Sequence, residues 1–266
     1  MVKPIATYAF EGINAGGKST VIKEISSYFL DRGYSTNVNK IGGLGDSLRM
    51  NRLKKILDYR ERLKRENQLT HKQEQDFIKD RIFRLAIRKQ INDYQKREFE
   101  NKTISLLDRT PLMSWAYSSS VDPSNHYLNE ILEEGLNLSE RLGIDTLFLL
   151  EIDAISVYSR IICRSLEGNK SIEEEVEDLT DLIPATEEIK KKVARKSLES
   201  LTSGVHFHRK KFRIWDFMSY EEIERQGRTY LEAAKMMNER TGTKVVRINA
   251  RESLNQVLAN IKEHTL

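Results

Sequence analysis

The sequence predicts an α/β protein of one domain, with a three-layer α/β/α architecture around a five-stranded parallel sheet. Three observations lead to this prediction. Short apolar runs alternate with segments of helical pattern along the chain. A glycine-rich stretch separates the first apolar run from the first helical segment. The length of 266 residues is close to that of single α/β domains, which have about 200 to 250 residues. Parallel strands need crossover connections, and the intervening helices would supply them.

Five apolar runs are the expected strands. The first, residues 5–10, ends at a glutamate and a glycine. After the glycine-rich stretch, apolar residues recur at helical spacing from Val21 to Phe29, so this part of the chain predicts a strand, a tight loop and a helix. The other candidates are residues 35–39, which form the weakest, 103–107, 146–150 and 244–248. In an open parallel sheet, ligands bind at the carboxyl ends of the strands.

Two long segments between the strands are predicted to be helical. Residues 44–100 contain no strand candidate, but an apolar stripe that includes Phe77 would pack one helix against the sheet. Residues 165–216 are polar, with an acidic run at 173–178 and a basic helical segment at 190–196. Because apolar residues recur through this region, an ordered lid-like helical insertion is favoured over a disordered linker.

Composition excludes several classes of protein. Charged residues make up 32% of the chain, but the net charge is only +4 and the two signs are interleaved, so no specific nucleic-acid partner is expected. The chain has neither an apolar run of about 18 residues nor the apolar core of a signal peptide, which predicts a cytoplasmic protein without a membrane partner. The single Cys163 cannot form an internal disulfide, and the five histidines lack zinc-ligand spacing.

One motif carries chemistry. Residues 12–19 read G-I-N-A-G-G-K-S and satisfy G-x-x-x-x-G-K-[ST], the phosphate-binding P-loop. The motif lies between the first strand and the first helix, where loop amides and the positive end of the helix dipole converge on a polyphosphate. Lys18 would contact the β- and γ-phosphates, and the Ser19 hydroxyl is placed to ligate Mg²⁺. The alternative is a glycine-rich turn with an exposed lysine. The expected ATP-binding residues are Gly12, Asn14, Ala15, Gly16, Gly17, Lys18, Ser19 and Thr20.

A second polar pair follows the third predicted strand. Asp108 ends the apolar run 103–107, where a carboxylate can organise the hydration shell of magnesium, although an aspartate there is also common in turns. Arg109 follows directly and would point into the same crevice. Because arginine binds anions bidentately, this position suggests an acceptor phosphate in addition to the donor nucleotide.

With these residues in view, the chain resembles the thymidylate kinase family over nearly its whole length and, more distantly, the deoxynucleoside kinases. The segment from Phe10 to Thr20 is similar to the family's F-E-G-x-x-x-x-G-K-S-T opening. Further similar segments are Phe77-Ile78-Lys79-Asp80-Arg81 (family F-A-A-D-R), Asp108-Arg109 with Ala116-Tyr117 (D-R-Y and A-Y), Gly42-Gly43 with Leu48-Arg49, Gly227-Arg228-Thr229-Tyr230-Leu231, and residues 245–250. The resemblance implies a P-loop NTPase fold.

The resemblance also implies roles for matching positions. Lys18, Ser19 and Thr20 would bind the donor and magnesium, with Asp108 in the magnesium shell. Arg109 would clamp the acceptor phosphate. The implied acceptor-binding residues are Asn14, Phe77, Arg81, Arg109 and Tyr117, and the implied catalytic residues are Lys18, Arg109, Arg160 and Arg164.

Two of these roles have plain structural alternatives. Phe77 lies on an apolar helical face and could equally belong to the core. Arg160 and Arg164, which fall where the family begins its arginine-bearing lid, are four residues apart and could be a solvated helix stripe.

The sequence also departs from the family. Asn14 stands where the family usually has an acidic residue, and residues 39–43 lack the arginine, glutamate and proline of the family's loop. Thr110 replaces an aromatic residue, the serine expected near Met113 is displaced or missing, and the lid region is longer. Donor-side residues are therefore intact while acceptor-side residues are altered.

The sequence thus predicts an ATP- and Mg²⁺-dependent kinase that acts on a (deoxy)nucleoside monophosphate, with dTMP the leading candidate. One alternative is a deoxynucleoside kinase, which would need a carboxylate near the acceptor hydroxyl, and Glu11 is the only candidate for that role. The other is a non-catalytic P-loop module that binds an NTP and regulates a partner. A homodimer is left open.

Overall fold

The computed structural model describes residues 3–13, 16–41, 62–63, 65–66, 81–121, 123–124, 127–203 and 219–266. At residues 81–86, 89 and 121 it describes the backbone. Within these residues the protein is α/β, and five strands form one parallel sheet in the order β2-β3-β1-β4-β5. The strands are β1 (Ala6–Gly12), β2 (Ser35–Lys40), β3 (Thr103–Asp108), β4 (Thr146–Glu151) and β5 (Lys244–Asn249).

The predicted parallel sheet is confirmed, but the strands end later than the apolar runs do. β3 includes Asp108, which pairs with Phe10 of β1 and with Lys40 of β2. In the same way, Glu151 pairs with Asn249 at the ends of β4 and β5. The strands therefore continue through polar residues at the carboxyl edge of the sheet, because these residues still pair with a neighbouring strand.

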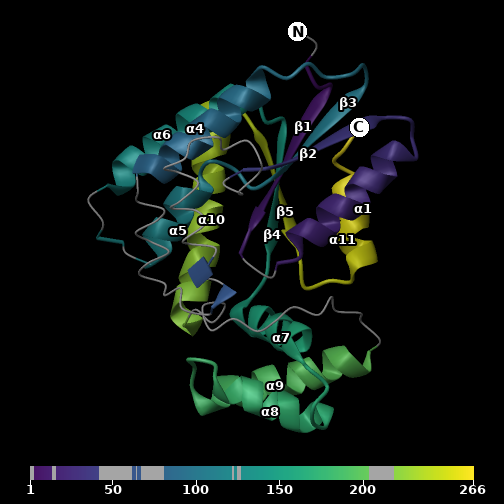
Figure 1. Cartoon of the computed structure of the whole chain (residues 1–266), viewed down its shortest axis with the longest axis vertical. Helices are drawn as coiled ribbons and strands as arrows, with labels where there is room; N and C mark the ends of the chain where they lie inside the picture. The colour runs from purple at the N-terminus through teal and green to yellow at the C-terminus, as the bar shows by residue number, and fades with distance from the viewer. Residues whose placement is uncertain are drawn as a thin grey trace.

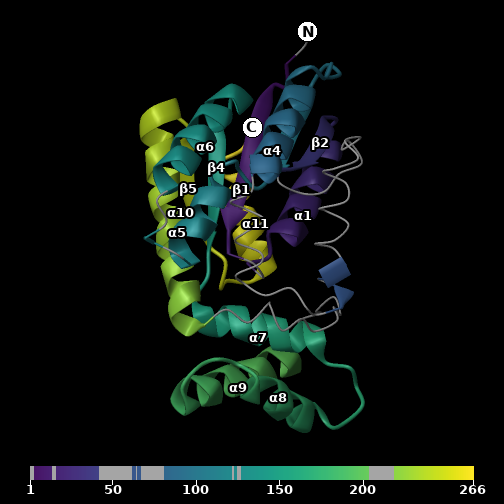
Figure 2. The ribbon, with the colours of Figure 1, turned by 60° about the vertical axis from the view of Figure 1, so that its left-hand side comes forward.

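Helices cover both faces of the sheet, as Figures 1 and 2 show. One face carries α1 (Lys18–Leu30) and α11 (Leu254–Lys262), and the opposite face carries α4 (Arg81–Gln95), α5 (Met113–Val121), α6 (Leu128–Leu142) and α10 (Tyr220–Thr241). The core lies between these layers. Phe10 of β1 and Phe148 of β4 are fully buried, and their rings stack with centroids 5.3 Å apart.

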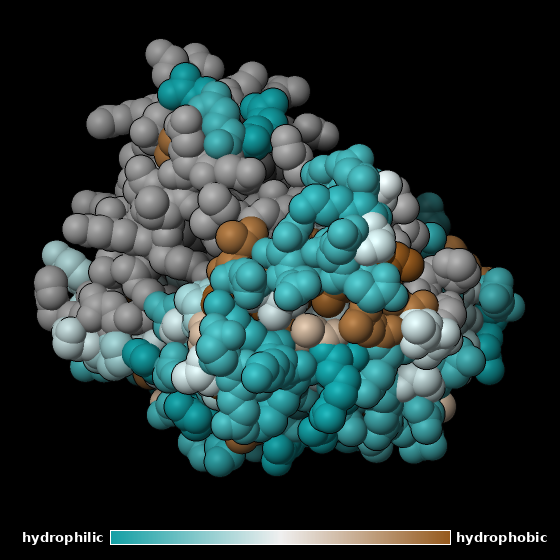
Figure 3. Space-filling model, turned by 90° about the horizontal axis from the view of Figure 1, so that it is seen from below, coloured by the Kyte–Doolittle hydropathy of each residue, from teal (hydrophilic) through white to brown (hydrophobic). Residues whose placement is uncertain are grey.

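Three further helices lie beyond the carboxyl ends of the strands (Figure 1). They are α7 (Ala154–Ser165), α8 (Ile172–Asp181) and α9 (Glu187–Thr202). Val176, Ile183 and Val193 of this segment are buried, and they belong to the same hydrophobic cluster as the residues around the sheet. Figure 3 views the molecule from this end, and the coloured part of the surface seen there is mostly hydrophilic, with apolar areas mainly near the middle of the view. The predicted insertion, residues 165–216, contains the helices α8 and α9 with non-helical connections at residues 166–171 and 182–186, and residues 204–216 lie outside the described part.

The connections define where a ligand would bind. The chain leaves β1 towards α1 on one face of the sheet, and it leaves the neighbouring β3 towards α5 on the opposite face (Figure 1). Adjacent strands whose connections go to opposite faces leave a crevice at their carboxyl ends, and open α/β sheets bind ligands there. In the described part of the chain, no helix is both long and apolar enough to cross a bilayer.

Candidate functional site

The glycines around the P-loop are required by backbone geometry. Gly12 ends β1 with φ 138°, and a Cβ atom added there would lie 2.5 Å from the carbonyl oxygen of Leu150 in β4. Gly17 precedes α1 with φ 91°, in the left-handed region. Both conformations favour glycine over residues with a side chain. The Gly12 backbone can therefore approach β4 closely, and the chain can turn into α1 at Gly17.

Lys18 is the first residue of α1, and its side chain folds back over the start of the loop. Its Nζ donates hydrogen bonds to the carbonyl oxygens of Gly12 (2.6 Å) and Ile13 (2.8 Å). The residue is only 6% exposed. Burial first, and then the positive charge of Arg109, lower the pKa of the Lys18 ammonium to about 7, although Glu11 and Asp108 oppose this shift. A cation in this position is poised to gain an anionic ligand.

Asp108 and Arg109 bring charge to the same place from β3. Asp108 is 8% exposed and lies close enough to raise the pKa of Lys18. Arg109 has φ 85°, and its backbone N–H donates to the carbonyl of Phe10 (3.0 Å). Its Nη1 atom lies 3.6 Å from Oε1 of Glu11 and donates to the hydroxyl of Tyr230 (3.3 Å). Two cations therefore lie near the carboxyl ends of β1 and β3: Lys18 at the start of α1, and Arg109 directly after β3.

Glu11 is the carboxylate at the centre of this arrangement. It is 3% exposed, and its Oε2 accepts hydrogen bonds from the backbone N–H (2.9 Å) and the hydroxyl (3.1 Å) of Thr110. Its Oε1 accepts from the backbone N–H of Gly12 (3.2 Å). Burial raises the pKa of the Glu11 carboxyl, although Arg109 and Lys18 oppose that rise. Glu11 thus links the end of β1 to the loop after β3.

Of the two arginines predicted in the lid, Arg160 reaches the P-loop. Its Nη2 donates to the carbonyl oxygen of Ala250 after β5, and its Nη1 lies 3.6 Å from where a Cβ atom on Gly17 would be. Burial lowers the pKa of its guanidinium, and the neighbouring charge of Arg164 adds to this effect. Arg160 is therefore half-buried beside the loop and does not belong to a purely solvated stripe. Arg164 lies one turn farther along α7.

The other predicted site residues lie on α1, α4 and α5 and in the loop before α1, or outside the described part of the chain. Ser19 is exposed and Thr20 half-buried in the first turn of α1, and Tyr117 is half-buried on α5. Gly16 donates its N–H to the carbonyl of Ile13 (3.2 Å). Arg81 begins α4, where only the backbone is described. The predicted Asn14, Ala15, Phe77 and Gly42-Gly43 lie outside the described residues.

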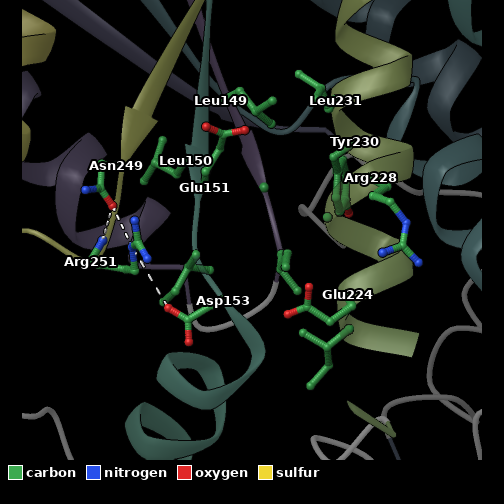
Figure 4. Close-up of a pocket in the computed structure, with 15 residues that line it drawn as sticks. Leu149, Leu150, Glu151, Asp153, Glu224, Arg228, Tyr230, Leu231, Asn249 and Arg251 are labelled. Carbon is green, nitrogen blue, oxygen red and sulfur yellow. Dashed lines mark hydrogen bonds and ion pairs between the residues drawn. The ribbon is translucent and has the colours of Figure 1, made fainter. Parts of the chain in front are cut away.

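A cavity of about 370 Å³ adjoins this site on the α10 side of the sheet. Figure 4 shows it between the carboxyl ends of β4 and β5 and the first half of α10. Gly12 and Ile13 form part of its wall, so it lies behind the start of the P-loop. Asp153 and Glu224 lie at the α7 end of the cavity, and the Asp153 carboxylate pairs with Arg251 at 4.0 Å. The sequence analysis did not predict this cavity.

Sequence reasoning also missed two contacts around Arg109, namely its own hydrogen bond to Tyr230 and the hydrogen bonds that Thr110 donates to Glu11. Tyr230 belongs to the apolar side of α10, where a tyrosine predicts core packing and nothing indicates the partner of its hydroxyl. Thr110 was noted only as a departure from an aromatic residue. Both contacts join residues about a hundred positions apart in sequence, and no local pattern reports such pairs.

Comparison with known proteins gives no independent assignment. The sequence matches no protein-family description. It also matches no curated protein.

Proposed function

We propose that the protein is an ATP- and Mg²⁺-dependent nucleotide kinase with a P-loop NTPase fold, of the thymidylate kinase type. It would transfer the γ-phosphoryl group of ATP to a (deoxy)nucleoside monophosphate, with dTMP the leading acceptor. The observation that carries the proposal is the pair of cations beyond the carboxyl ends of β1 and β3, where Lys18 is buried and Arg109 is partly buried. Lys18 lies in a P-loop, and Arg109 faces the same crevice from the neighbouring strand.

Two cations on different strands suit a reaction between two anions. Lys18 and the loop amides would bind the donor phosphates, and Arg109 would bind the acceptor phosphate from the β3 side. Arg160 beside Gly17 would add positive charge over the donor. Phosphoryl transfer depends mainly on positioning and charge neutralisation, and these residues supply both.

The residues present also fit a bound magnesium ion. Within the described residues, no group of three or more His, Cys, Asp or Glu side chains could hold a metal unaided. Mg²⁺ in phosphotransfer sites is bound by one or two protein oxygens together with substrate phosphates and water, so such a group is not required. The Ser19 hydroxyl and the Asp108 carboxylate would be the protein ligands or would hold ligating water. The ion would neutralise charge on the donor phosphates.

The state of Glu11 favours a monophosphate over a nucleoside as the acceptor. A nucleoside hydroxyl has to lose a proton to a base, and Glu11 is the carboxylate that the sequence suggests for that role. Both of its oxygens already accept hydrogen bonds from Thr110 and Gly12, and the residue is 3% exposed. A phosphate oxygen acceptor scarcely needs a base.

An acceptor panel tests the proposal. The protein is incubated with Mg-ATP and either dTMP, dUMP, dCMP, dAMP or dGMP, or the matching nucleosides, and products are separated by chromatography. We expect a nucleoside diphosphate from at least one monophosphate. Transfer only to nucleosides would favour the deoxynucleoside kinase alternative. ATP binding without any acceptor-dependent ADP release would favour the non-catalytic module.

A further inference from the structure

Arg109 is held by groups from two different elements. Its backbone is in the left-handed region, which few residues other than glycine adopt. Its side chain is 17% exposed and lies between the carboxylate of Glu11, at the end of β1, and the hydroxyl of Tyr230, on α10. A strained backbone and a partly buried charge persist only where the surroundings fix them.

We propose that Thr110 and Tyr230, acting with Glu11, are positioning residues that hold the Arg109 guanidinium towards the acceptor phosphate. This inference rests on the proposed function, because that function assigns Arg109 to the acceptor. It adds two residues, Thr110 and Tyr230, to which the sequence analysis gave no role in the site.

Thr110 fixes Arg109 from the backbone side. Its N–H and its hydroxyl both donate to Oε2 of Glu11, at 2.9 and 3.1 Å. Because Thr110 directly follows Arg109, these two bonds fix the chain just after the residue with positive φ. The remaining oxygen of Glu11 faces the Arg109 guanidinium at 3.6 Å. One buried carboxylate therefore orients both the backbone and the side chain of the arginine.

Tyr230 fixes Arg109 from the side-chain end. It is 3% exposed, and its hydroxyl accepts a hydrogen bond from Nη1 of Arg109 at 3.3 Å. The preceding residue, Thr229, donates its hydroxyl to the carbonyl of Ala116 on α5 (2.9 Å), which sets the position of α10 at this turn. The tyrosine ring also lines the cavity behind the P-loop (Figure 4). Tyr230 therefore holds its hydroxyl at a fixed place beside the guanidinium.

Glu11, Thr110 and Tyr230 together form a cage around Arg109. Such a cage would matter because it preorganises the guanidinium. A free arginine side chain loses considerable rotamer freedom when it binds an anion, and a guanidinium already held in place loses less. The cage leaves only 17% of the side chain exposed, so the acceptor phosphate meets a charge of fixed direction. Loss of this preorganisation should therefore weaken the binding of a nucleoside monophosphate and leave the binding of the nucleoside unchanged.

Two conservative variants and one matched control test the inference. Tyr230→Phe keeps the ring and removes the hydroxyl. Thr110→Val removes the hydroxyl but keeps the backbone N–H. Tyr94→Phe makes the same change as Tyr230→Phe at another buried tyrosine, whose hydroxyl has no hydrogen-bond partner among the described residues. Calorimetry gives the affinity of each protein for dTMP, thymidine and Mg-ADP, and steady-state kinetics gives the KM values for dTMP and ATP.

Loss of a hydrogen bond to a charged group usually costs about tenfold in affinity or more. Because the bond between Tyr230 and Arg109 is long, we expect Tyr230→Phe to weaken dTMP binding at the low end of this range, about tenfold. Thr110→Val should weaken it about threefold because one of two bonds remains. Affinities for thymidine and Mg-ADP should stay within about twofold, as should every constant of Tyr94→Phe. In an Arg109→Ala background, Tyr230→Phe should cause no further loss, because a positioning residue needs the residue that it positions.

The contrary results are distinct. Three results would overturn the positioning inference. Tyr230→Phe could weaken dTMP and thymidine binding equally, it could cause its full loss in the Arg109→Ala background, or it could cause no loss at all. If dTMP binds and the cage behaves as expected but no dTDP forms, the positioning inference stands and the kinase proposal falls. If dTDP forms but Tyr230→Phe and Arg109→Ala act independently, the kinase proposal stands and the positioning inference is wrong. A wild type that binds no nucleoside monophosphate overturns both.

Discussion

Nucleotide affinity should fall as pH rises, because Lys18 is buried and its pKa lies near 7 in the nucleotide-free protein. Binding brings negative phosphates beside the ammonium, which raises its pKa. The complex therefore contains protonated Lys18, whereas the free protein loses that proton above pH 7. Binding must then take up a proton, and affinity that is fully present well below pH 7 is lost progressively as pH rises through 7.

The magnitude follows from the pKa of about 7. The protonated fraction of Lys18 falls from about three quarters at about pH 6.5 to about 3% at about pH 8.5. If only the protonated form binds well, affinity drops about 25-fold between those values, equivalent to about 1.9 kcal/mol. Proton uptake should rise over the same interval from about a quarter of a proton to nearly one.

Calorimetric titration with Mg-ADP measures both quantities when it is repeated in buffers of different ionisation enthalpy. Lys18→Ala is the matched variant, and its weaker binding should lack the pH dependence. The reasoning would be refuted by a wild type whose affinity and proton uptake are flat over this range. It would also be refuted if Lys18→Ala kept the wild-type slope, because another group would then be titrating.

Two further predictions concern folding. Gly12→Ala should destabilise the protein by about 2 kcal/mol or more, because its Cβ would collide with the Leu150 carbonyl oxygen, whereas Gly33→Ala meets no atom within 4 Å and should cost only the backbone strain of about 1 kcal/mol. Equal losses in thermal melts of the two variants would contradict this. Glu175 accepts hydrogen bonds from backbone N–H groups between α7 and α8, and these bonds, that of Gly168 first, lower the pKa of its carboxyl. The stability that the ionised Glu175 carboxyl gives to this loop is present at neutral pH, and it is lost as pH falls through the lowered pKa of that carboxyl. Glu175→Gln should therefore speed hydrogen exchange at residues 167–170 at neutral pH, and unchanged exchange would show that the carboxylate does not order this loop.

Much of the fold could be predicted because its signals are local. Apolar runs mark the strands, and the glycine pattern places the phosphate-binding motif between the first strand and the first helix, which begins at Lys18 in the structure. The strand ends could not be predicted, since Asp108 is polar but still pairs with both neighbouring strands. The surroundings of Arg109 were also out of reach. Its contacts with Glu11 and Tyr230 depend on strand order and on the packing of α10, and neither leaves a trace in the residues next to it.

Product identification by ³¹P NMR shows directly whether the protein transfers a phosphoryl group to a nucleoside monophosphate. Wild-type protein and Lys18→Ala are each incubated with Mg-ATP and dTMP, and with Mg-ATP alone. We expect the resonances of dTDP and ADP to grow together with the wild type, only when dTMP is present, and at least about a hundredfold more slowly with Lys18→Ala. Wild-type protein that leaves dTMP and every other nucleoside monophosphate unchanged would contradict the account, as would equal product formation by folded Lys18→Ala.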